Sequence, residues 1–524
     1  MLGFHIDMNF AQFTKGYLEK WLTKLSQLGY DTIFWELEDN VKWQTCPECV
    51  SPEAFTKDEF REILNLCKSL KMESIPVFQT LGHCEYVLKH DKYKHLAELP
   101  DKIDQYCPLH PQLPYFIKQW IDEYIELFES IRKFHIGADE AFLLGECPKC
   151  QEFIEKNSLS DLYVRYVSEI SGHLIRQNIQ PIIWADMILK HPDEIGKLST
   201  QIMFADWRYN IYRGNGKVWV WSRNQLCDRE QLDEETLKVY GNFLFPEGDE
   251  PGREPETFYT SDFLKSHGFE TVLCSSSSAF GDSIFVPRTY LHFRNIYDMA
   301  KKGSEKGFAG SVLTSWTVRL FPWELQEPCI ELAPFTINNR SMSIEDFQKI
   351  YLQKHFGITD KAFFNACGLL SKTGLFMCVL TLGFYKEIKP VPDDFIENIL
   401  QKLAKDKQLE LELEKNQKLL CEYKQALKLL EQFDSKAKYG HEEISTWQLA
   451  ARNLINRAKS SVCLLKASLK QNSDKQEVAA ILQQLNKLKT ETMKLYEPII
   501  KPMRLNYVMH CIYDSVENAL QKNI

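Results

Sequence analysis

The sequence predicts an α/β protein: a (β/α)8 TIM barrel over residues 1–335, followed by an all-α helical region over residues 336–524. Short runs rich in β-branched and aromatic residues alternate with amphipathic segments through about the first 330 residues, which is the rhythm of such a barrel. A doubly wound open sheet has a similar rhythm, but no glycine-rich phosphate loop follows the first run. Beyond Pro334 the β-rich runs nearly vanish and helical periodicity replaces them.

Eight short apolar runs, each bounded by polar or turn residues, are expected to form the barrel strands. They are residues 3–8, 31–37, 74–80, 133–139, 181–187, 202–207, 271–275 and 310–316. Between them apolar residues recur at helical spacing, most clearly over residues 17–28, 57–69, 115–130 and 162–177. Residues 209–260 interrupt the rhythm with glycine, proline and charge, so we interpret them as a long loop or small β excursion over one barrel face.

The second half is expected to form an antiparallel helical bundle packed beside the barrel. Apolar spacing predicts one long charged helix over residues 396–430, a second over 447–465, a third over 478–495 and a fourth over 507–520. Ser473 and Asp474 are candidate N-caps of the third helix. The heptads are not sustained, so the Lys- and Glu-rich residues 402–424 are interpreted as a solvated face, and a homodimer through them is left open.

The composition is that of a globular chain and limits its partners. Hydrophobic residues make up 44% of the chain, and the net charge of −9 disfavours a nucleic-acid binder with a broad basic face. No apolar stretch reaches the roughly 20 residues that span a bilayer, so no membrane segment is expected. The first residues show no basic segment followed by a long apolar run, so no secretory signal is expected. Most of the 15 cysteines lie singly in apolar patterns, which favours reduced thiols in a cytoplasmic protein.

Function in a barrel of this kind collects at the carboxyl ends of the strands. Those ends carry carboxylates beside Trp and Tyr, the groups that bind a sugar, because rings stack on its apolar face and acids hold its hydroxyls. The residues at these ends are Asp7, Glu36, Glu38, Asp39, His83, Glu85, Asp139, Glu140, Trp184, Asp186, Asp206, Trp207, Tyr209 and Trp316. For any single aromatic residue, packing in the core is the alternative interpretation.

The most specific pattern is the segment HIGADE, residues 135–140. Adjacent residues on an ideal strand point to opposite faces, so Asp139 and Glu140 reach one pocket only where the strand curls or ends between them. The rim of a barrel permits that, and Gly137 allows close packing at this level. The alternative interpretation is a surface acid pair in a loop.

HIGADE resembles the H-x-G-x-D-E signature of family 20 glycoside hydrolases, the β-N-acetylhexosaminidases. The segments WELED, QTLGHCEYVLKH, IIWADM, SSAFGDS and VLTSWTVRLFPWE look like those of the hexosaminidase D branch. The resemblance covers roughly residues 1–335 and leaves the helical half outside. Many members carry an extra domain before the barrel; none is expected here, because the first strand is predicted to begin at residue 3, which also fits that branch.

The resemblance implies an exo-acting β-N-acetylhexosaminidase that hydrolyses terminal β-linked GlcNAc or GalNAc with retention and without a catalytic cofactor. The substrate's own 2-acetamido oxygen would attack the anomeric carbon and form an oxazolinium ion. Asp139 would hold the acetamido N–H and offset the developing charge. Glu140 would protonate the departing oxygen and then deprotonate the incoming water, with a pKa raised by Asp139 and by partial burial.

The resemblance implies further roles. Trp184, Trp207 and Trp316 would wall the N-acetyl group and the ring, and Tyr209 would donate to the acetamido oxygen. Ring hydroxyls would bind Asp7, Glu38 and Asp39; His83 and Glu85 would buttress Glu140; and Asp282 and Glu324 would reach the sugar. Many family members hold the sugar with an Arg at the end of the first strand, and this chain has none there. How O3 and O4 are held, and the choice between GlcNAc and GalNAc, therefore stay open.

Two C-P-x-C segments, Cys46 to Cys49 and Cys147 to Cys150, stand 101 positions apart. Four thiolates in two such pairs are a usual ligand set of structural zinc. One pair follows the second predicted strand and the other the fourth, on the same barrel face, so the two loops could meet over the third strand. We interpret these four cysteines as the ligands of a structural zinc; a redox pair and unligated thiols are the alternatives.

Two other functions remain open. Another barrel glycosidase could use Asp139 and Glu140, or Glu38, in a direct displacement, and it would cleave sugars that lack the 2-acetamido group. A sugar-binding scaffold acting through its helical region would not turn substrate over at all.

Overall fold

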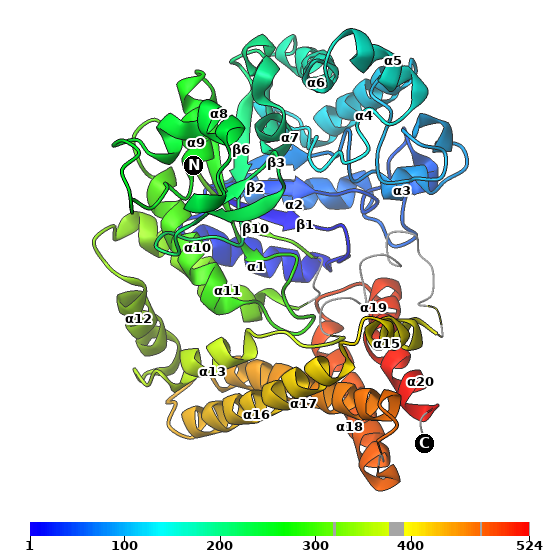
Figure 1. Ribbon diagram of the computed structural model, residues 1–524, viewed down its shortest axis with the longest axis vertical. Helices are drawn as coiled ribbons and strands as arrows, with labels where there is room; N and C mark the ends of the chain where they lie inside the picture. The colour runs from blue at the N-terminus through cyan, green and yellow to red at the C-terminus, as the bar shows by residue number, and fades with distance from the viewer. Residues whose placement is uncertain (318–320, 377–391, 393, 472–473, 523–524) are drawn as a thin grey trace.

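The computed structural model describes residues 1–317, 321–376, 392, 394–471 and 474–522 (Figure 1). Within these residues eight parallel strands close into a barrel in the order β1-β10-β9-β6-β5-β4-β3-β2, which confirms the predicted fold. The strands are β1 (Leu2–Asp7), β2 (Thr32–Glu36), β3 (Glu73–Val77), β4 (Lys133–His135), β5 (Gln180–Trp184), β6 (Met203–Trp207), β9 (Glu270–Ser278) and β10 (Gly310–Ser315).

Helices surround the barrel and connect its strands. The main ones are α1 (Lys15–Leu28), α2 (Lys57–Ser69), α4 (Leu113–Phe128), α6 (Leu159–Ile175), α9 (Tyr259–Ser266), α10 (Thr289–Gly303) and α11 (Trp323–Asn338). Local sequence sets their ends: Thr56 and Glu59 form a capping box at the start of α2, and the side chain of Thr14 caps α1. Shorter helices lie at the rim, namely α3 (Glu85–Leu88), α5 (Pro148–Lys156) and α7 (Asp186–Lys190).

The excursion over residues 209–260 holds more structure than a loop. An antiparallel hairpin of β7 (Lys217–Val220) and β8 (Gln225–Asp228) forms the expected small β unit. It is followed by α8 (Glu234–Leu244), which was not predicted. Asp233 caps α8 by accepting from the Thr236 N–H at 2.8 Å, a local signal that the surrounding charge obscured.

The second half is helical, as predicted. Its helices are α12 (Ile344–Phe356), α13 (Ala362–Leu370), α15 (Phe395–Lys405), α16 (Leu409–Asp434), α17 (His441–Ser468), α18 (Lys475–Tyr496), α19 (Pro502–Met509) and α20 (Ser515–Gln521). The single helix expected over residues 396–430 is wrong, because the chain turns at Lys407, whose φ is 56°. Asp474 caps α18 as expected, and Ser473 lies outside the described residues. None of the described helices is both long and apolar enough to cross a membrane.

The segment before α19 joins the helical region to the first barrel strands. Phe13 and Ile500 form an antiparallel bridge, flanked by hydrogen bonds of 2.8 Å from Thr14 N to the Ile499 carbonyl and 2.7 Å from Lys501 N to the Gln12 carbonyl. The hydrophobic core runs through both halves. The division at residues 335 and 336 stays a prediction, since α11 crosses it.

A second contact between the barrel and the helical region consists of charged side chains. The imidazole of His355 on α12 lies 3.0 Å from a Glu331 oxygen on α11 and 3.2 Å from a Glu443 oxygen on α17. Burial opposes protonation, but the hydrogen bonds to these two carboxylates raise the pKa of His355 to about 9.

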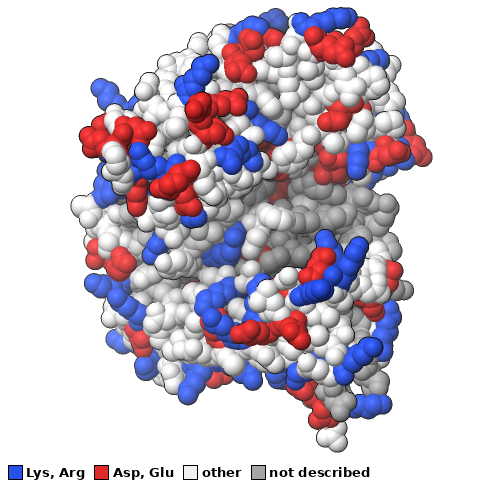
Figure 2. Space-filling view, viewed as in Figure 1, with Lys and Arg blue, Asp and Glu red and all other residues white. Residues whose placement is uncertain are grey.

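On the face shown in Figure 2, basic and acidic side chains are interspersed over both halves.

Candidate active site

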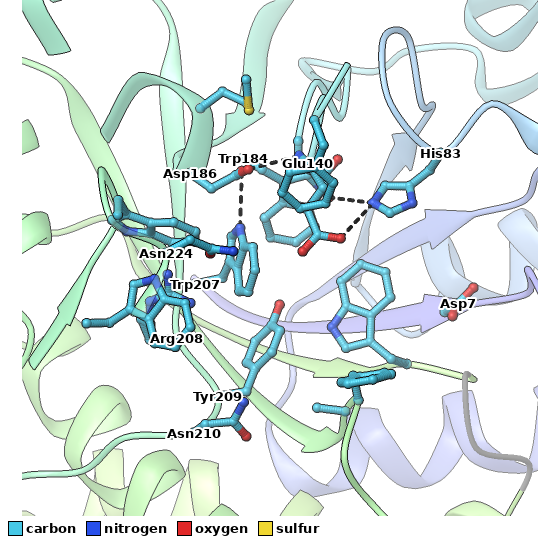
Figure 3. Close-up of a pocket in the computed structure, with 18 of the residues that line it drawn as sticks. Asp7, His83, Glu140, Trp184, Asp186, Trp207, Arg208, Tyr209, Asn210 and Asn224 are labelled. Atoms are coloured by element: carbon cyan, nitrogen blue, oxygen red, sulfur yellow. Dashed lines mark hydrogen bonds and ion pairs between the residues drawn. The ribbon is translucent and has the colours of Figure 1, made fainter. Parts of the chain in front are cut away.

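A cavity of about 540 Å³ opens at the carboxyl ends of the barrel strands, within the size range of ligand pockets. Each barrel strand, or the segment directly after it, contributes a residue to it. The lining includes Asp7, Glu36, Gln79, His83, Asp139, Glu140, Trp184, Asp186, Trp207, Arg208, Tyr209 and Trp316. Figure 3 shows Glu140, His83, Trp207 and Tyr209 arranged around one common space. The structure thus gathers these predicted residues at one place.

The two neighbouring acids both reach this cavity because the chain curls after β4. Gly137, Ala138 and Glu140 all have positive φ, of 63°, 66° and 45°. Gly137 cannot be replaced without strain, since a Cβ there would lie 1.9 Å from the Gln79 Oε1. The strand therefore ends before the acids, and the alternation that would separate them does not apply.

His83 links the acids. Its Nε2 lies 3.3 Å from the Asp139 Oδ2 and 3.3 Å from the Glu140 Oε2. Figure 3 shows His83 directed toward Glu140. The loop after β3 can come this close only because Gly82 precedes His83: a Cβ at Gly82 would lie 2.3 Å from the Asp139 carbonyl oxygen. One imidazole therefore lies within reach of both carboxyl groups.

Burial is the largest influence on the pKa values of Asp139 and Asp186. It raises the pKa of Asp139, against the opposing charge of His83. It also raises the pKa of Asp186 to about 8, helped by the nearby Asp139. Asp186 accepts from the Glu140 N–H at 2.9 Å, so it fixes the backbone of that residue. The raised pKa of Asp186 limits the negative charge that the cavity holds.

Deeper in the barrel, Glu36 and Asp7 extend the acidic lining. Burial opposes ionisation of Glu36, but hydrogen bonds from His5 at 2.9 Å and from Gln79 at 2.9 Å lower its pKa overall. Burial and the charge of Glu36 raise the pKa of Asp7 to about 6. The sequence placed Glu36 at a strand end, but the roles in binding ring hydroxyls were assigned to Glu38 and Asp39, which follow it.

Aromatic rings form the walls. Trp184 and Trp316 have ring centroids 5.9 Å apart, and Trp207 stacks on Tyr209 at 5.1 Å with the planes 26° apart. These spacings are in the range of favourable ring pairs. All four predicted aromatic residues thus lie together on the cavity rather than in separate parts of the core.

Five predicted sugar-binding residues do not line the cavity. Three have partners elsewhere: Asp39 pairs with Arg504 at 3.1 Å, Asp282 with Arg288 at 2.7 Å, and Glu324 with Lys20 at 2.8 Å. Two others are Glu38, in the turn after β2, and Glu85, the first residue of α3. Closeness to a strand end does not decide which side chains reach the cavity: Glu38 is two positions past β2 and does not line it, whereas His83 is six positions past β3 and does.

An arginine does lie near the end of the first strand, but it comes from the helical region. Arg504 on α19 donates to the Asn9 carbonyl at 3.3 Å as well as to Asp39. No pattern near residue 9 could have indicated it, because the two positions are 495 residues apart.

The hairpin of β7 and β8 adds residues that the sequence interpretation missed. Trp219, Trp221 and Asn224 line the cavity, and Arg208 lies among the rings with its guanidinium 3.3 Å from the Trp221 ring centre and 4.3 Å from that of Trp219. Burial lowers the pKa of Arg208 to about 9. The alternation Trp219-Val220-Trp221 is the sequence pattern that could have indicated a strand with two aromatic side chains on one face.

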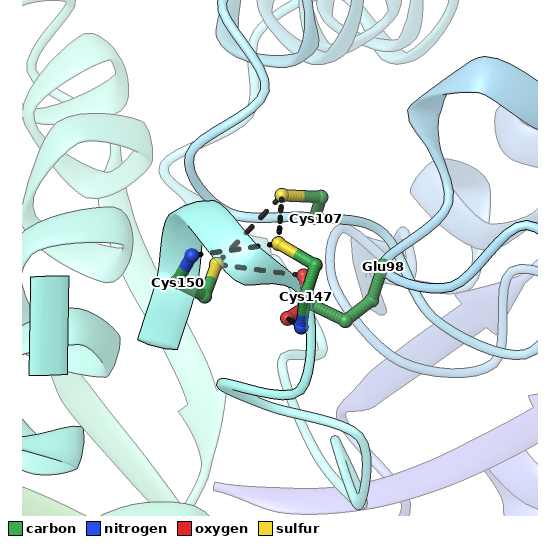
Figure 4. Close-up of side chains that lie close together, drawn as sticks. All are labelled: Glu98, Cys107, Cys147 and Cys150. Carbon is green, nitrogen blue, oxygen red and sulfur yellow. Dashed lines mark hydrogen bonds between the residues drawn. The ribbon is translucent and has the colours of Figure 1, made fainter. Parts of the chain in front are cut away.

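The predicted four-cysteine zinc site does not form. Cys46 and Cys49 are joined as a disulfide, which agrees with the redox pair kept open as an alternative for these segments. Cys147 and Cys150 instead meet Cys107 and Glu98 (Figure 4). The long loop after β3 supplies these two residues and lies where the two C-P-x-C loops were expected to meet. Cys107 precedes a proline, as Cys46 and Cys147 do, and that shared pair was the available signal.

Comparison with known proteins agrees with this geometry. Residues 15–223 match the family model described as glycosyl hydrolase family 20, catalytic domain. Hexosaminidase D of Bos taurus is 26% identical over 242 residues, covering 42% of this chain and 69% of the bovine protein. Hexosaminidase D of Homo sapiens is 28% identical over 237 residues, covering 44% of this chain, and the match spans about half (49%) of the human protein.

Among solved structures, the Flavobacterium johnsoniae chitobiase aligns with 99% of this chain and 77% of its own, at 14% identity and a TM-score of 0.47. Residues 15–223, which include the HIGADE segment at the rim of the barrel, are therefore similar to the catalytic domain of glycosyl hydrolase family 20, and the chain is similar to hexosaminidase D.

Proposed function

We propose that this protein is an exo-β-N-acetylhexosaminidase that removes terminal β-linked GlcNAc or GalNAc by a retaining, substrate-assisted reaction. One observation supports this most strongly: Asp139 and Glu140 line a single cavity whose walls are Trp184, Trp207 and Trp316. The family match adds the class of reaction.

The unequal burial of the two acids supports separate roles. The side chain of Asp139 is 7% exposed, whereas that of Glu140 is 37% exposed. A buried Asp139 suits a group that holds the acetamido N–H and offsets the charge that develops as the acetamido oxygen attacks the anomeric carbon. A more exposed Glu140 suits a proton donor, since the leaving group and then the attacking water must both reach it.

The surroundings favour the intramolecular attack. Tyr209 stacks on Trp207, and its hydroxyl would donate to the acetamido oxygen and orient that atom toward the anomeric carbon. The tryptophan walls would hold the acetyl methyl group and exclude water, so that the oxazolinium forms before hydrolysis. His83 would keep both acids in place through the two steps.

Hydrolysis of 4-nitrophenyl N-acetyl-β-glucosaminide and of the galactosaminide tests the proposal. Glu140→Gln and Asp139→Asn should each lower kcat at least a hundredfold, because general acid catalysis alone contributes about 10² to 10⁴. Glu146→Gln is the matched control, an exposed glutamate in the same loop but off the cavity. Full activity in both active-site variants would refute the assignment.

A substrate with a 2-hydroxyl in place of the acetamido group separates the mechanisms. Direct displacement would cleave it, whereas the substrate-assisted reaction would not. The same assay, run with both N-acetyl epimers, measures the preference between GlcNAc and GalNAc. Absence of any turnover in the wild type would favour a sugar-binding scaffold.

The remaining expectations are independent of the chemistry. We expect the protein in the cytoplasm and leave a homodimer open; fractionation and sedimentation of the full chain test these two points. A zinc would serve structure and not catalysis.

A further inference from the structure

We propose that Glu98, Cys107, Cys147 and Cys150 bind one structural zinc ion beside the active-site loop. All four side chains are buried, at 2%, 5%, 8% and 0% exposure, and one ligand atom of each lies within 4.8 Å of the others (Figure 4). None of the three cysteines forms a disulfide. The set contains only soft thiolates and one carboxylate, ligands that zinc accepts.

The distances match a tetrahedral site. Zn–S bonds of about 2.3 Å and a Zn–O bond of about 2.1 Å require S···S edges of about 3.8 Å and S···O edges of about 3.6 Å. The Cys107 Sγ lies 3.6 Å from the Cys147 Sγ and 3.7 Å from the Cys150 Sγ, and the Cys150 Sγ lies 3.5 Å from the Glu98 Oε2. Three edges of the polyhedron therefore already have nearly the required lengths.

The backbone prepares the ligands from two loops. In the loop after β3, Glu98 N donates to the Gln105 carbonyl at 3.0 Å and Cys107 N donates to the Leu96 carbonyl at 2.8 Å. These backbone hydrogen bonds hold the segments that carry Glu98 and Cys107 side by side. In the loop after β4, Cys147 and Cys150 occupy the N-cap and the first turn of α5. The ligand set thus joins two loops that the barrel topology places side by side.

Charge favours an ion at this place. Among the described residues no Lys, Arg or His forms an ion pair with the buried Glu98 carboxylate, which is held by the Cys147 N–H at 2.9 Å. A buried carboxylate without a cation is costly, and a divalent ion removes that cost while it also neutralises thiolates. The Cys150 N–H points at the Cys147 Sγ at 3.5 Å, which stabilises a thiolate further.

A second buried group of possible ligands shows the contrast. Glu327, Glu331 and His355 also lie within reach of one another. There, Lys24 pairs with Glu327, and the Lys354 Nζ lies 2.8 Å from a Glu331 oxygen. Lysine side chains already neutralise those carboxylates, so a metal ion is not needed there. The cysteine group has no such cation beside Glu98 among the described residues.

The ion would stabilise the loops that carry the catalytic acid. Gln105, between Glu98 and Cys107 in the chain, accepts from the Leu143 N–H at 2.8 Å and bridges to Gly82. Leu143 follows Glu140 by three positions, and Gly82 precedes His83. A zinc ion bound at one end of this network would therefore restrain the loop that carries Glu140 and the loop that carries His83 at the other end.

Zinc content of the purified full chain tests the proposal directly, whatever the enzyme's activity. Protein prepared without chelator should contain about one zinc per chain by elemental analysis, and Cys107→Ser and Glu98→Gln should each contain at least tenfold less. Cys46→Ser together with Cys49→Ser should leave the zinc content unchanged. A wild type that takes up no zinc even when incubated with Zn²⁺, or zinc lost only from the Cys46 and Cys49 variant, would overturn the proposal.

Spectroscopy guards against variants that fail to fold. Wild-type protein exchanged with Co²⁺ should show thiolate-to-metal charge-transfer absorption. Cys107→Ser, which loses zinc on purification, should show a weaker band only when Co²⁺ is added in excess, because Cys147 and Cys150 remain. Thiol titration should show three additional reactive thiols when a chelator is added. Cys421→Ser, which removes an exposed thiol on α16, is the control and should alter neither the spectrum nor that difference. An unchanged thiol count with chelator would count against the site.

Discussion

Replacing Arg504 by Met should destabilise the whole protein and not only the end of α19. The Arg504 guanidinium lies 3.1 Å from an Asp39 oxygen, and their side chains are 10% and 8% exposed. Removing one partner of a buried ion pair costs about 3–5 kcal/mol, because the other charge stays buried. The lost hydrogen bond to the Asn9 carbonyl adds about 1 kcal/mol.

Two comparison variants sharpen this value. Arg452→Met removes a pair of similar geometry, 2.9 Å from Glu491, whose side chains are 36% and 33% exposed; it should cost less than about 1 kcal/mol. Adding Asp39→Asn to Arg504→Met removes the stranded charge and should recover at least about 2 kcal/mol.

Urea unfolding followed by circular dichroism and by tryptophan fluorescence measures these free energies, with coincident curves as the check on two-state behaviour. If Arg504→Met costs no more than Arg452→Met, or if the double variant is the less stable one, the buried pair does not hold the two halves together. A raised KM for Asp39→Asn at unchanged stability would instead restore the role in sugar binding that the sequence suggested for Asp39.

Three further predictions concern the site and its support. Gly82→Ala should lower kcat at least tenfold, since its Cβ would lie 2.3 Å from the Asp139 carbonyl oxygen and displace the loop; Gly241→Ala, with nothing within 4 Å, should not, and equal kcat in both would contradict the close approach. The pKa of His355, raised from 6.5 to about 9, means that its stabilising contribution is complete below pH 6.5 and disappears as pH rises through 9. Thermal midpoints across that range should fall more steeply in the wild type than in His355→Gln, and parallel curves would contradict this. Arg208→Met should raise KM more than it lowers kcat, because the guanidinium holds two tryptophans of the hairpin at the cavity; a loss in kcat alone would argue against that role.

Much of the fold could be read from the sequence, because period and order along the chain determine it. Eight apolar runs alternating with helices close into a barrel, and closure brings the ends of all strands to one rim. That is why Asp7, Asp139, Trp184, Trp207 and Trp316 could be placed together without any knowledge of contacts. The curl that lets both acids enter the cavity was also foreseeable, as a requirement of HIGADE at a strand end.

Tertiary structure decided what lies past the rim. The partner of Asp39 is an arginine 465 positions away, and the partners of Cys147 are a cysteine and a glutamate from the loop after β3. The packing of the hairpin residues Trp219 and Trp221 against Arg208, which directly follows β6, is another such contact. Such contacts depend on how loops without any repeating period pack against one another, so a local pattern predicts that a loop exists but not which side chains it will meet.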